Sequence, residues 1–311
     1  MKLKSVHIVP TYACNLACSY CYASKYRGKF PQMSWGKFRK ILDWLVTQGV
    51  SKITFIGGEP TIWSHIDKAI EASQNLGMQV GLLSNGMKLP KVLPHMVMIN
   101  GTNLTDPKLC PKILKNLTKY HEHKIPAGLR FNLGVKDSST QLHKYADWAK
   151  KYASSVSFSP IVPYLLDKKL GEVLFDFAKL VKKNKQKITL NRAVPLCLFT
   201  EKQLKFLRTN CGLYSRCEPA KRSVVINPDG SFLPCVDLNL AAKNCLNFGK
   251  VVDKLRCDPL LAACESCEFF PKQCQGGCLS MKLKKGKLIK SFSFTSTTKA
   301  STTPLWIWAM Q

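Results

Sequence analysis

Acidic residues are scarce in this sequence of 311 residues. There are 19 Asp and Glu against 47 Lys and Arg, so the formal net charge is +28. Such an excess favours anionic partners such as phosphate groups, acidic peptides or an anionic membrane surface, although a solvated basic surface is the commoner reason for many lysines. The charge bears on partners and carries no information on the fold.

Long hydrophobic runs are also missing. No stretch approaches the roughly 18 consecutive apolar residues that a membrane span needs. Lys2 and Lys4 precede only a short apolar run, which His7 and Pro10 interrupt, and this does not support a secretory signal. We therefore expect a cytoplasmic protein with no membrane partner. The sequence shows no internal repeat, and the histidines show no clustered metal spacing: His7, His65, His95, His121, His123 and His143.

Cysteine, in contrast, is abundant. The chain has 14 cysteines, of which three lie at positions 14, 18 and 21, one at 110 and ten between 197 and 278. Cytoplasmic thiols are reduced and rarely form structural disulfides, so metal binding is the natural explanation. The placement predicts two separate cysteine-rich sites.

Short β-branched runs alternate with longer helical patterns from Lys4 to about Ser159, which predicts βα units around a parallel sheet. The expected strands are Val6 to Val9, Lys52 to Ile56, Gln79 to Leu83, Val97 to Ile99, Leu129 to Leu133 and Val156 to Phe158. The expected helices are Trp35 to Gln48, 65 to 75, 108 to 121, 140 to 152 and Gly171 to Lys183. Six units fall short of the eight that close a complete barrel. We expect an α/β fold with a partial (β/α)6 TIM-like barrel.

The character of the sequence changes after about Lys187. Cysteines become frequent, helical periodicity fades, and Val224 to Pro234 has the composition of a hairpin around Asn227-Pro228-Asp229-Gly230. We expect residues 1–187 to form the α/β core domain and 188–290 a loop-rich second domain. Residues 291–311 begin with a Ser- and Thr-rich stretch and are expected to form a flexible tail.

The first cysteine cluster, Cys14, Cys18 and Cys21, follows the first expected strand on a loop at the carboxyl end of the sheet. Three thiolates can hold three irons of a four-iron cluster, which normally takes four cysteines. One iron would then be free to bind a small molecule. The alternative is a zinc site that takes a fourth ligand from elsewhere, because short cysteine spacings also suit tetrahedral zinc.

The pattern Cys-x3-Cys-x-aromatic-Cys, with Tyr20 at the aromatic position, resembles the radical S-adenosylmethionine (radical SAM) superfamily. Gly57-Gly58-Glu59-Pro60, at the end of the second expected strand, is similar to the segment of that family that binds the methionine amino group of SAM. Its two glycines would let backbone carbonyls approach a ligand closely. The resemblance also implies SAM contacts for Ser84 and Asn85 after the third strand and for Asn132 in the fifth, although each also fits an ordinary strand end or core polar group.

The later cysteines resemble the SPASM domain, the auxiliary-cluster module of radical SAM enzymes that modify peptides and proteins, such as anaerobic sulfatase-maturing enzymes. Cys217 is followed by twelve residues, Gly230, four residues and Cys235, and then come Cys264-x2-Cys267-x6-Cys274-x3-Cys278. The family pattern has five residues before the third cysteine of that run, not six. The resemblance implies one auxiliary [4Fe-4S] cluster on Cys211, Cys217, Cys235 and Cys278.

A second auxiliary cluster would use Cys264, Cys267 and Cys274. The family has a further cysteine downstream, and none follows Cys278 here. The cluster could keep an open iron, use a non-cysteine ligand, recruit Cys245 or Cys257, or not form, and paired cysteine spacings also suit a zinc ribbon. The tail could have replaced the segment that normally carries this ligand. Cys110 and Cys197 are expected to be plain buried thiols.

The resemblance implies an oxidoreductase-type enzyme that reductively cleaves SAM to a 5′-deoxyadenosyl radical and abstracts a hydrogen from a peptide or protein. The cofactors would be SAM, its [4Fe-4S] cluster and one or two auxiliary [4Fe-4S] clusters, and an external flavodoxin- or ferredoxin-type donor would supply the electron. Asp237 could accept a proton, although a solvated loop aspartate is the more ordinary interpretation.

Several alternatives remain for the substrate. A small molecule of antibiotic or cofactor synthesis is the main alternative to a peptide substrate, and RNA is a further one. A non-enzymatic zinc protein is the alternative to an enzyme. No RNA-binding motif is visible, so a nucleic-acid partner is not expected. Because no leader-peptide-binding domain fits before Cys14, we expect a separate leader-binding partner or peptide binding at the barrel mouth alone.

Overall fold

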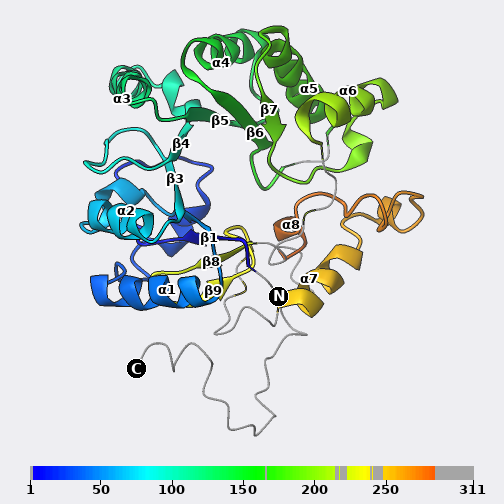
Figure 1. Ribbon diagram of the computed structural model, residues 1–311. Helices are drawn as coiled ribbons and strands as arrows, with labels where there is room; N and C mark the ends of the chain where they lie inside the picture. The colour runs from blue at the N-terminus through cyan, green and yellow to red at the C-terminus, as the bar shows by residue number, and fades with distance from the viewer. Residues whose placement is uncertain are drawn as a thin grey trace, which may run out of the picture.

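The protein is built around one nine-stranded sheet in an α/β arrangement (Figure 1). The computed structural model describes residues 3–164, 167–213, 217, 223–238, 240 and 248–283. The strands are β1 (Ser5–Ile8), β2 (Lys52–Phe55), β3 (Gln79–Ser84), β4 (Met96–Asn100), β5 (Ala127–Leu133), β6 (Ser155–Pro160), β7 (Ile188–Leu190), β8 (Ser223–Ile226) and β9 (Phe232–Leu233). Their order is β7-β6-β5-β4-β3-β2-β1-β8-β9, and every neighbouring pair is parallel except β8 and β9.

The sheet separates an apolar outer face from a polar inner face. Along β1, Val6 and Ile8 are fully buried while His7 is only partly buried, as expected when successive side chains point to opposite faces. In β5, Leu129 and Phe131 alternate in the same way with partly exposed polar residues. The outer residues pack under the helices, so the inner face is left to carry polar groups.

Helices cover the outer face, as the sequence pattern predicts. They are α1 (Trp35–Thr47), α2 (Ile66–Asn75), α3 (Cys110–Glu122), α4 (Ser139–Tyr152), α5 (Lys168–Lys183) and α6 (Glu201–Cys211), and Figure 1 shows α1 to α5 around the outside of the curved sheet. The buried side of α1 consists of Phe38, Ile41, Leu42 and Leu45. Ser34 caps this helix by accepting a hydrogen bond from the Lys37 amide. All six expected strands and all five expected helices are confirmed, and the sheet is an open partial barrel.

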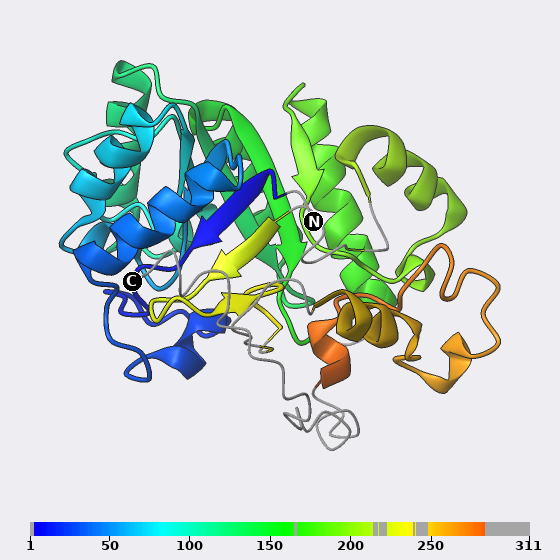
Figure 2. The same ribbon diagram turned by 60° about the horizontal axis from the view of Figure 1, so that its bottom comes forward.

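The hairpin expected at 224–234 is present, but its place in the fold differs from a separate loop-rich unit. Its first strand, β8, pairs in parallel with β1 over Ser5 to Ile8, and β9 closes the hairpin in antiparallel pairing. Figure 2 shows β1 and β8 side by side. The short strand β7 and the helix α6 are elements that the sequence did not predict. The boundary near residue 187 stays a prediction.

The C-terminal part lies beyond the sheet. It contains α7 (Phe248–Cys257), the 3-10 turn η6 (Ala262–Cys264) and α8 (Ser280–Leu283). The predicted tail 291–311 and Cys245 lie outside the described residues. None of the described helices is both long and apolar enough to cross a membrane.

Candidate active site

The three cysteines of the first cluster lie on the loop that follows β1. Cys14, Cys18 and Cys21 are partly exposed, and none is in a disulfide. Desolvation raises the pKa of the Cys18 thiol, and the charges of Cys21 and Cys14 raise it further. The three sulfurs therefore lie close enough to interact electrostatically, as ligands of one cluster would.

The Gly57-Gly58-Glu59-Pro60 segment packs directly against the chain that leads into this loop. The Gly58 amide donates to the Thr11 carbonyl oxygen at 3.0 Å, and the Glu59 amide donates to that of Ala13 at 2.9 Å. A Cβ added to Gly58 would lie 2.1 Å from the Ala13 oxygen. Position 58 therefore requires glycine because two protein segments are in contact there. The sequence analysis had expected a different reason, the close approach of a ligand to the backbone.

Glu59 is a buried junction between the ends of β2 and β3. Its Oε1 accepts from the Thr61 amide (3.1 Å), the Thr61 hydroxyl (2.7 Å) and the Ser84 hydroxyl (2.9 Å), and its Oε2 accepts from the Asn85 amide (2.7 Å). Burial raises the pKa of this carboxyl, and these hydrogen bonds oppose the rise. Asn85 in turn donates through Nδ2 to Asn15 Oδ1 at 2.8 Å. The predicted residues Glu59, Ser84 and Asn85 therefore form one network with the cysteine loop.

A second polar chain joins Tyr20 to Asn132. The Tyr20 hydroxyl accepts a hydrogen bond from Asn100 Nδ2 at 2.9 Å, and Asn132 Nδ2 donates to Asn100 Oδ1 at 3.4 Å. Asn132 Oδ1 then accepts from the Ser159 hydroxyl at 3.4 Å. The chain runs from the cysteine loop across the ends of β4, β5 and β6, where α/β folds of this kind bind ligands.

Asn103 provides a test of whether these residues fit a cluster and SAM. Its Oδ1 accepts from the Tyr20 hydroxyl at 3.4 Å and from the Cys18 thiol at 3.6 Å. Its Nδ2 is buried and has no hydrogen-bond partner among the described residues. An unsatisfied buried N–H costs about 1–3 kcal/mol, and a cluster sulfur or a SAM oxygen would satisfy it. The Cys18 thiol beside this amide and the free thiols of Cys14 and Cys21 on the same loop fit the predicted cofactor.

The β8–β9 hairpin closes against the cysteine loop. Val225 and Leu233 of the hairpin share an apolar cluster with Tyr12 and Tyr26, and Cys21 packs against that cluster. The Tyr12 hydroxyl donates to Asn227 Oδ1 at 2.7 Å. The hairpin therefore brings the segment that carries Cys235 to the first cysteine loop.

Of the four cysteines expected at the first auxiliary cluster, Cys278 interacts with both Cys217 and Cys235. The pKa of Cys235 is raised to about 12, mainly by burial, and the charge of Cys278 contributes. Burial also raises the pKa of Cys217, with a further contribution from Cys278, and Gln275 Nε2 donates to Cys217 Sγ at 3.1 Å. Burial raises the pKa of the fourth thiol, Cys211, to about 11, and the charge of Lys182 opposes the rise.

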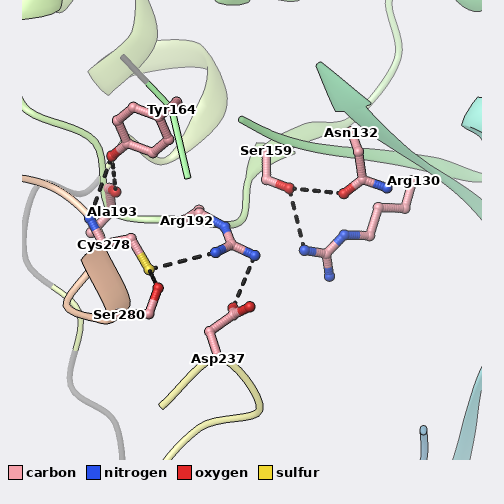
Figure 3. A network of polar contacts seen from close by, with 9 residues as sticks. All are labelled: Arg130, Asn132, Ser159, Tyr164, Arg192, Ala193, Asp237, Cys278 and Ser280. Carbon is pink, nitrogen blue, oxygen red and sulfur yellow. Dashed lines mark hydrogen bonds and ion pairs between the residues drawn. The ribbon is translucent and has the colours of Figure 1, made fainter. Parts of the chain in front are cut away.

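Arg192 connects this group to Asp237, as Figure 3 shows. The guanidinium forms an ion pair with Asp237 Oδ2 at 2.9 Å and donates to Cys278 Sγ at 3.5 Å. Both side chains of the ion pair are 15% exposed. A solvated loop aspartate is therefore the wrong interpretation of Asp237, because Arg192 pairs with it in a largely buried position. Burial raises the pKa of Tyr22, beside Cys21, and the charge of Asp237 contributes to the rise.

Two predicted thiols differ in exposure. Cys110 is partly exposed at the start of α3, and Cys197 is exposed, so the expectation of plain buried thiols is wrong for Cys197. Its neighbours in the 3-10 turn η4 (Leu196–Leu198) take the buried positions instead. Among the described residues, no three His, Cys, Asp or Glu side chains are arranged to hold a single metal ion. Cluster ligation by the cysteines stays a prediction.

Comparison with known families decides the class. Residues 8–157 match the model of the radical SAM superfamily. The chain contains a radical SAM domain. The matched segment includes the cysteine loop and the Gly57–Pro60 segment described above, so both lie within the radical SAM domain.

The solved structures that resemble the radical SAM chain extend the likeness beyond that domain. Streptococcus suis SuiB bound to precursor peptide SuiA overlays with a TM-score of 0.64 at 19% identity, covering 91% of this chain and 73% of SuiB. Native anSMEcpe with bound AdoMet and Cp18Cys peptide overlays with a TM-score of 0.59 at 17% identity, covering 88% of each chain. At these identities the likeness shows the shared fold.

Curated relatives match shorter segments. An S-adenosylmethionine-dependent nucleotide dehydratase of Flammeovirga pacifica is 35% identical over 83 residues, which are 25% of this chain and 29% of the relative. The sporulation killing factor maturation protein SkfB of Bacillus subtilis (strain 168) is 32% identical over 77 residues, which are 25% of this chain and 19% of SkfB. The chain thus spans less than a third of the length of either relative.

Sequence reasoning missed several residues of this radical SAM site. They are Asn15, Asn100, Asn103, Tyr22 and Arg192, and the Tyr22 hydroxyl donates to the Gly57 carbonyl oxygen at 3.0 Å. Single polar residues at strand ends have no motif of their own. Asn15 and Tyr22 had a usable signal, since they directly follow Cys14 and Cys21.

Proposed function

We propose that this radical SAM enzyme abstracts a hydrogen atom from a peptide or protein substrate and so carries out a post-translational modification. The observation that carries the proposal is that the hairpin bearing Cys235 and Asp237 packs on the loop bearing Cys14, Cys18 and Cys21. The two cysteine regions then share one site. The fold likeness to SuiB and anSMEcpe, which were solved with peptides bound, supports the same class of substrate.

The cofactor set of the proposal is SAM, one [4Fe-4S] cluster that binds it, and auxiliary [4Fe-4S] clusters. When bound, the SAM cluster supplies the one-electron cleavage of SAM that starts hydrogen abstraction. Cys14, Cys18 and Cys21 would hold it. Cys211, Cys217, Cys235 and Cys278 would hold one auxiliary cluster, and Cys264, Cys267 and Cys274 belong to the second.

The chain's own residues would orient SAM. Glu59 fixes the bend of the Gly57–Pro60 segment through four hydrogen bonds, so the backbone carbonyls of the segment are held for the methionine amino group. Ser84 and Asn85 are fixed by the same carboxylate. Asn103, whose Oδ1 accepts from the Cys18 thiol, has an amide donor without a partner among the described residues. Tyr20 and Asn132 are linked through Asn100 across the strand ends.

Two partners belong to the proposal. A flavodoxin- or ferredoxin-type donor would deliver the electron, and a separate protein would present a leader peptide. The excess of basic residues, +28 in formal charge, favours acidic protein surfaces as partners in both cases.

Deuterium transfer tests the substrate class. The protein would be reconstituted anaerobically with iron and sulfide and given SAM, dithionite and the peptide fraction of its source organism grown in D2O. A peptide substrate would transfer deuterium into 5′-deoxyadenosine, which mass spectrometry detects. Deuterated nucleoside triphosphates form the second arm, and the Cys14→Ala variant is the control that cannot hold the complete cluster. Transfer from the nucleotide arm alone would contradict a peptide substrate.

A nucleotide or other small molecule is the second candidate substrate. It is favoured by the similarity to S-adenosylmethionine-dependent nucleotide dehydratases and by the basic charge, which suits phosphate groups. The nucleotide arm of the same experiment tests it directly.

A further inference from the structure

The second auxiliary site has three cysteines from the C-terminal segment and lacks a fourth. Cys264 and Cys267 are joined by a turn in which the Cys267 amide donates to the Cys264 carbonyl oxygen at 3.3 Å. Cys274 follows, and its Sγ accepts from the Gly276 amide at 3.4 Å. The inference below rests on the proposed function, because it takes this group to be a cluster site.

The Gly276-Gly277 segment holds these cysteines against a distant part of the chain. A Cβ added to Gly276 would lie 3.9 Å from Cys264 Sγ, and a Cβ added to Gly277 would lie 3.1 Å from the Pro195 ring. Tyr164 lies at the same place, with its hydroxyl 2.5 Å from the added atom. One pair of glycines therefore has Cys264 on one side and Pro195 on the other, so the segment around Pro195 borders the cysteine group.

Cys197 lies two residues beyond Pro195, on the 3-10 turn η4. Leu196 and Leu198 on either side of it are buried at 5% and 2% exposure, whereas Cys197 is exposed. The turn is fixed from behind, because a Cβ added to Gly171 of α5 would lie only 2.0 Å from the Leu198 carbonyl oxygen. A turn that buries both leucines must direct the cysteine side chain outward.

The electrostatics agree with this placement. The pKa of the Cys197 thiol is raised by desolvation and then by the charges of Cys274 and Cys264. The placement itself comes from the packing: the Gly276-Gly277 pair has Cys264 on one side and Pro195 on the other, and Cys197 follows Pro195 by two residues. Cys197 therefore borders the group that contains Cys264 and Cys274, although it lies more than 60 residues before them in the sequence.

We propose that Cys197 is the fourth ligand of a second auxiliary [4Fe-4S] cluster, together with Cys264, Cys267 and Cys274. Each thiol loses its proton as the thiolate binds iron, and the iron and sulfide come from the cell's cluster supply or from reconstitution. A four-iron cluster separates its ligand sulfurs more widely than a single ion does. That no three side chains among the described residues are placed to hold a single metal ion therefore does not contradict a cluster, whose ligand sulfurs lie farther apart.

Cys257 is the competing ligand. Its charge acts on Lys282, as do those of Cys264 and Cys274, so it lies in the same region at the end of α7. The Lys282 ammonium is buried there and donates to the carbonyl oxygens of Leu255 and Arg256 at 2.8 and 3.2 Å. The sequence pattern left Cys245 and Cys257 as two of several alternatives, beside an open iron, a non-cysteine ligand or no cluster, and passed over Cys197.

Iron and sulfide content of single-cysteine variants tests the proposal. The full chain would be reconstituted anaerobically, and iron, sulfide and zinc would be measured per chain together with Mössbauer and EPR spectra. We expect Cys197→Ala and Cys264→Ala to lose about four irons each, or to convert one cluster to a three-iron form with its own EPR signal. Cys257→Ala and Cys110→Ala should keep the wild-type content.

Unchanged iron and spectra in Cys197→Ala, a loss in Cys257→Ala in its place, or zinc at this site would each overturn the proposal. Cys197→Ser repeats the test with a smaller change in shape, and circular dichroism verifies that each variant is folded. The Cys14→Ala/Cys18→Ala/Cys21→Ala variant separates this inference from the proposed function. It should lose about four irons, and adding Cys197→Ala should remove about four more. If the triple variant kept its iron while Cys197→Ala still lost iron, the SAM cluster would be contradicted and the assignment of Cys197 would stand.

Discussion

Glu59 joins the Gly57–Pro60 segment to the end of β3 through hydrogen bonds to its carboxylate. It is fully buried, and two backbone amides donate to its carboxylate, that of Thr61 to Oε1 and that of Asn85 to Oε2. In a Glu59→Gln variant the side-chain amide accepts at one end only. One backbone N–H would then face an NH2 group, whichever way the side chain is oriented.

We therefore expect Glu59→Gln to lower the free energy of unfolding by about 1–3 kcal/mol, the cost of one unsatisfied buried donor. SAM affinity should fall with it. Guanidinium unfolding and SAM binding by isothermal titration measure the two effects. Ser84→Ala removes one hydroxyl donor to Glu59 and also the acceptor of the Gly86 amide, so it should likewise cost about 1–3 kcal/mol. A Glu59→Gln variant as stable as the wild type would show that the carboxylate does not hold this bend.

His7 makes the fold sensitive to acid. Its pKa is lowered from 6.5 to about 4 by desolvation and by the charges of Lys52 and Arg130. The unfolded chain therefore binds a proton more readily than the folded chain between these values. The free energy of unfolding therefore has its full value above pH 6.5, where His7 is neutral in both states. It falls by about 2–3 kcal/mol as the pH falls toward 4.

Replacing His7 by Gln should flatten the stability curve over that range. The measurement is the free energy of unfolding from pH 4 to pH 7.5 for both proteins. Parallel curves would show that other groups cause the acid sensitivity.

At the scale of elements, two glycines make a matched pair. A Cβ on Gly58 would lie 2.1 Å from the Ala13 carbonyl oxygen, whereas a Cβ on Gly36 in α1 would meet nothing within 4 Å. Gly58→Ala should therefore displace the Gly57–Pro60 segment from the cysteine loop at a cost of about 3 kcal/mol. Gly36→Ala should be neutral or stabilising by up to about 1 kcal/mol, since alanine favours helix. Thermal unfolding compares them, and equal effects would exclude the proposed packing.

The strands and helices differ in how far the sequence could predict them. Strands such as β2 and β5 and helices such as α1 follow from alternation and helical spacing, which act locally. The strand β7 has three residues, Ile188–Leu190, too few to give a pattern. The pairing of β8 with β1 joins residues more than 200 positions apart, and packing decides such a pairing, which no local motif encodes.

The candidate site divides in the same way. Cys14, Cys18, Cys21 and the Gly57–Pro60 segment could be found because their spacing is itself the signal. Asn103 and Arg192 could not, since their role comes from neighbours brought together by the fold, Cys18 for the first and Asp237 with Cys278 for the second. Cys197 was passed over for this reason too.

At the scale of the whole molecule, the Arg192–Asp237 ion pair joins the chain after β7 to the segment after β9. Removing one partner of a largely buried pair leaves an uncompensated charge. We expect Arg192→Met or Asp237→Asn alone to cost about 2–3 kcal/mol, and the double variant to cost less than the sum of the two. Guanidinium unfolding of the reconstituted protein measures this cycle. Strict additivity would show that the pair does not couple the two parts.

The central claim is that the loop after β1 and the Gly57–Pro60 segment form a site that cleaves SAM. The most direct measurement is 5′-deoxyadenosine and methionine formation from SAM and dithionite by the anaerobically reconstituted enzyme. We predict turnover by the wild type and by Cys110→Ala, and a loss of at least about a hundredfold in Cys18→Ala. Full activity in Cys18→Ala, or none in a wild type that carries its iron and sulfide, would contradict the account.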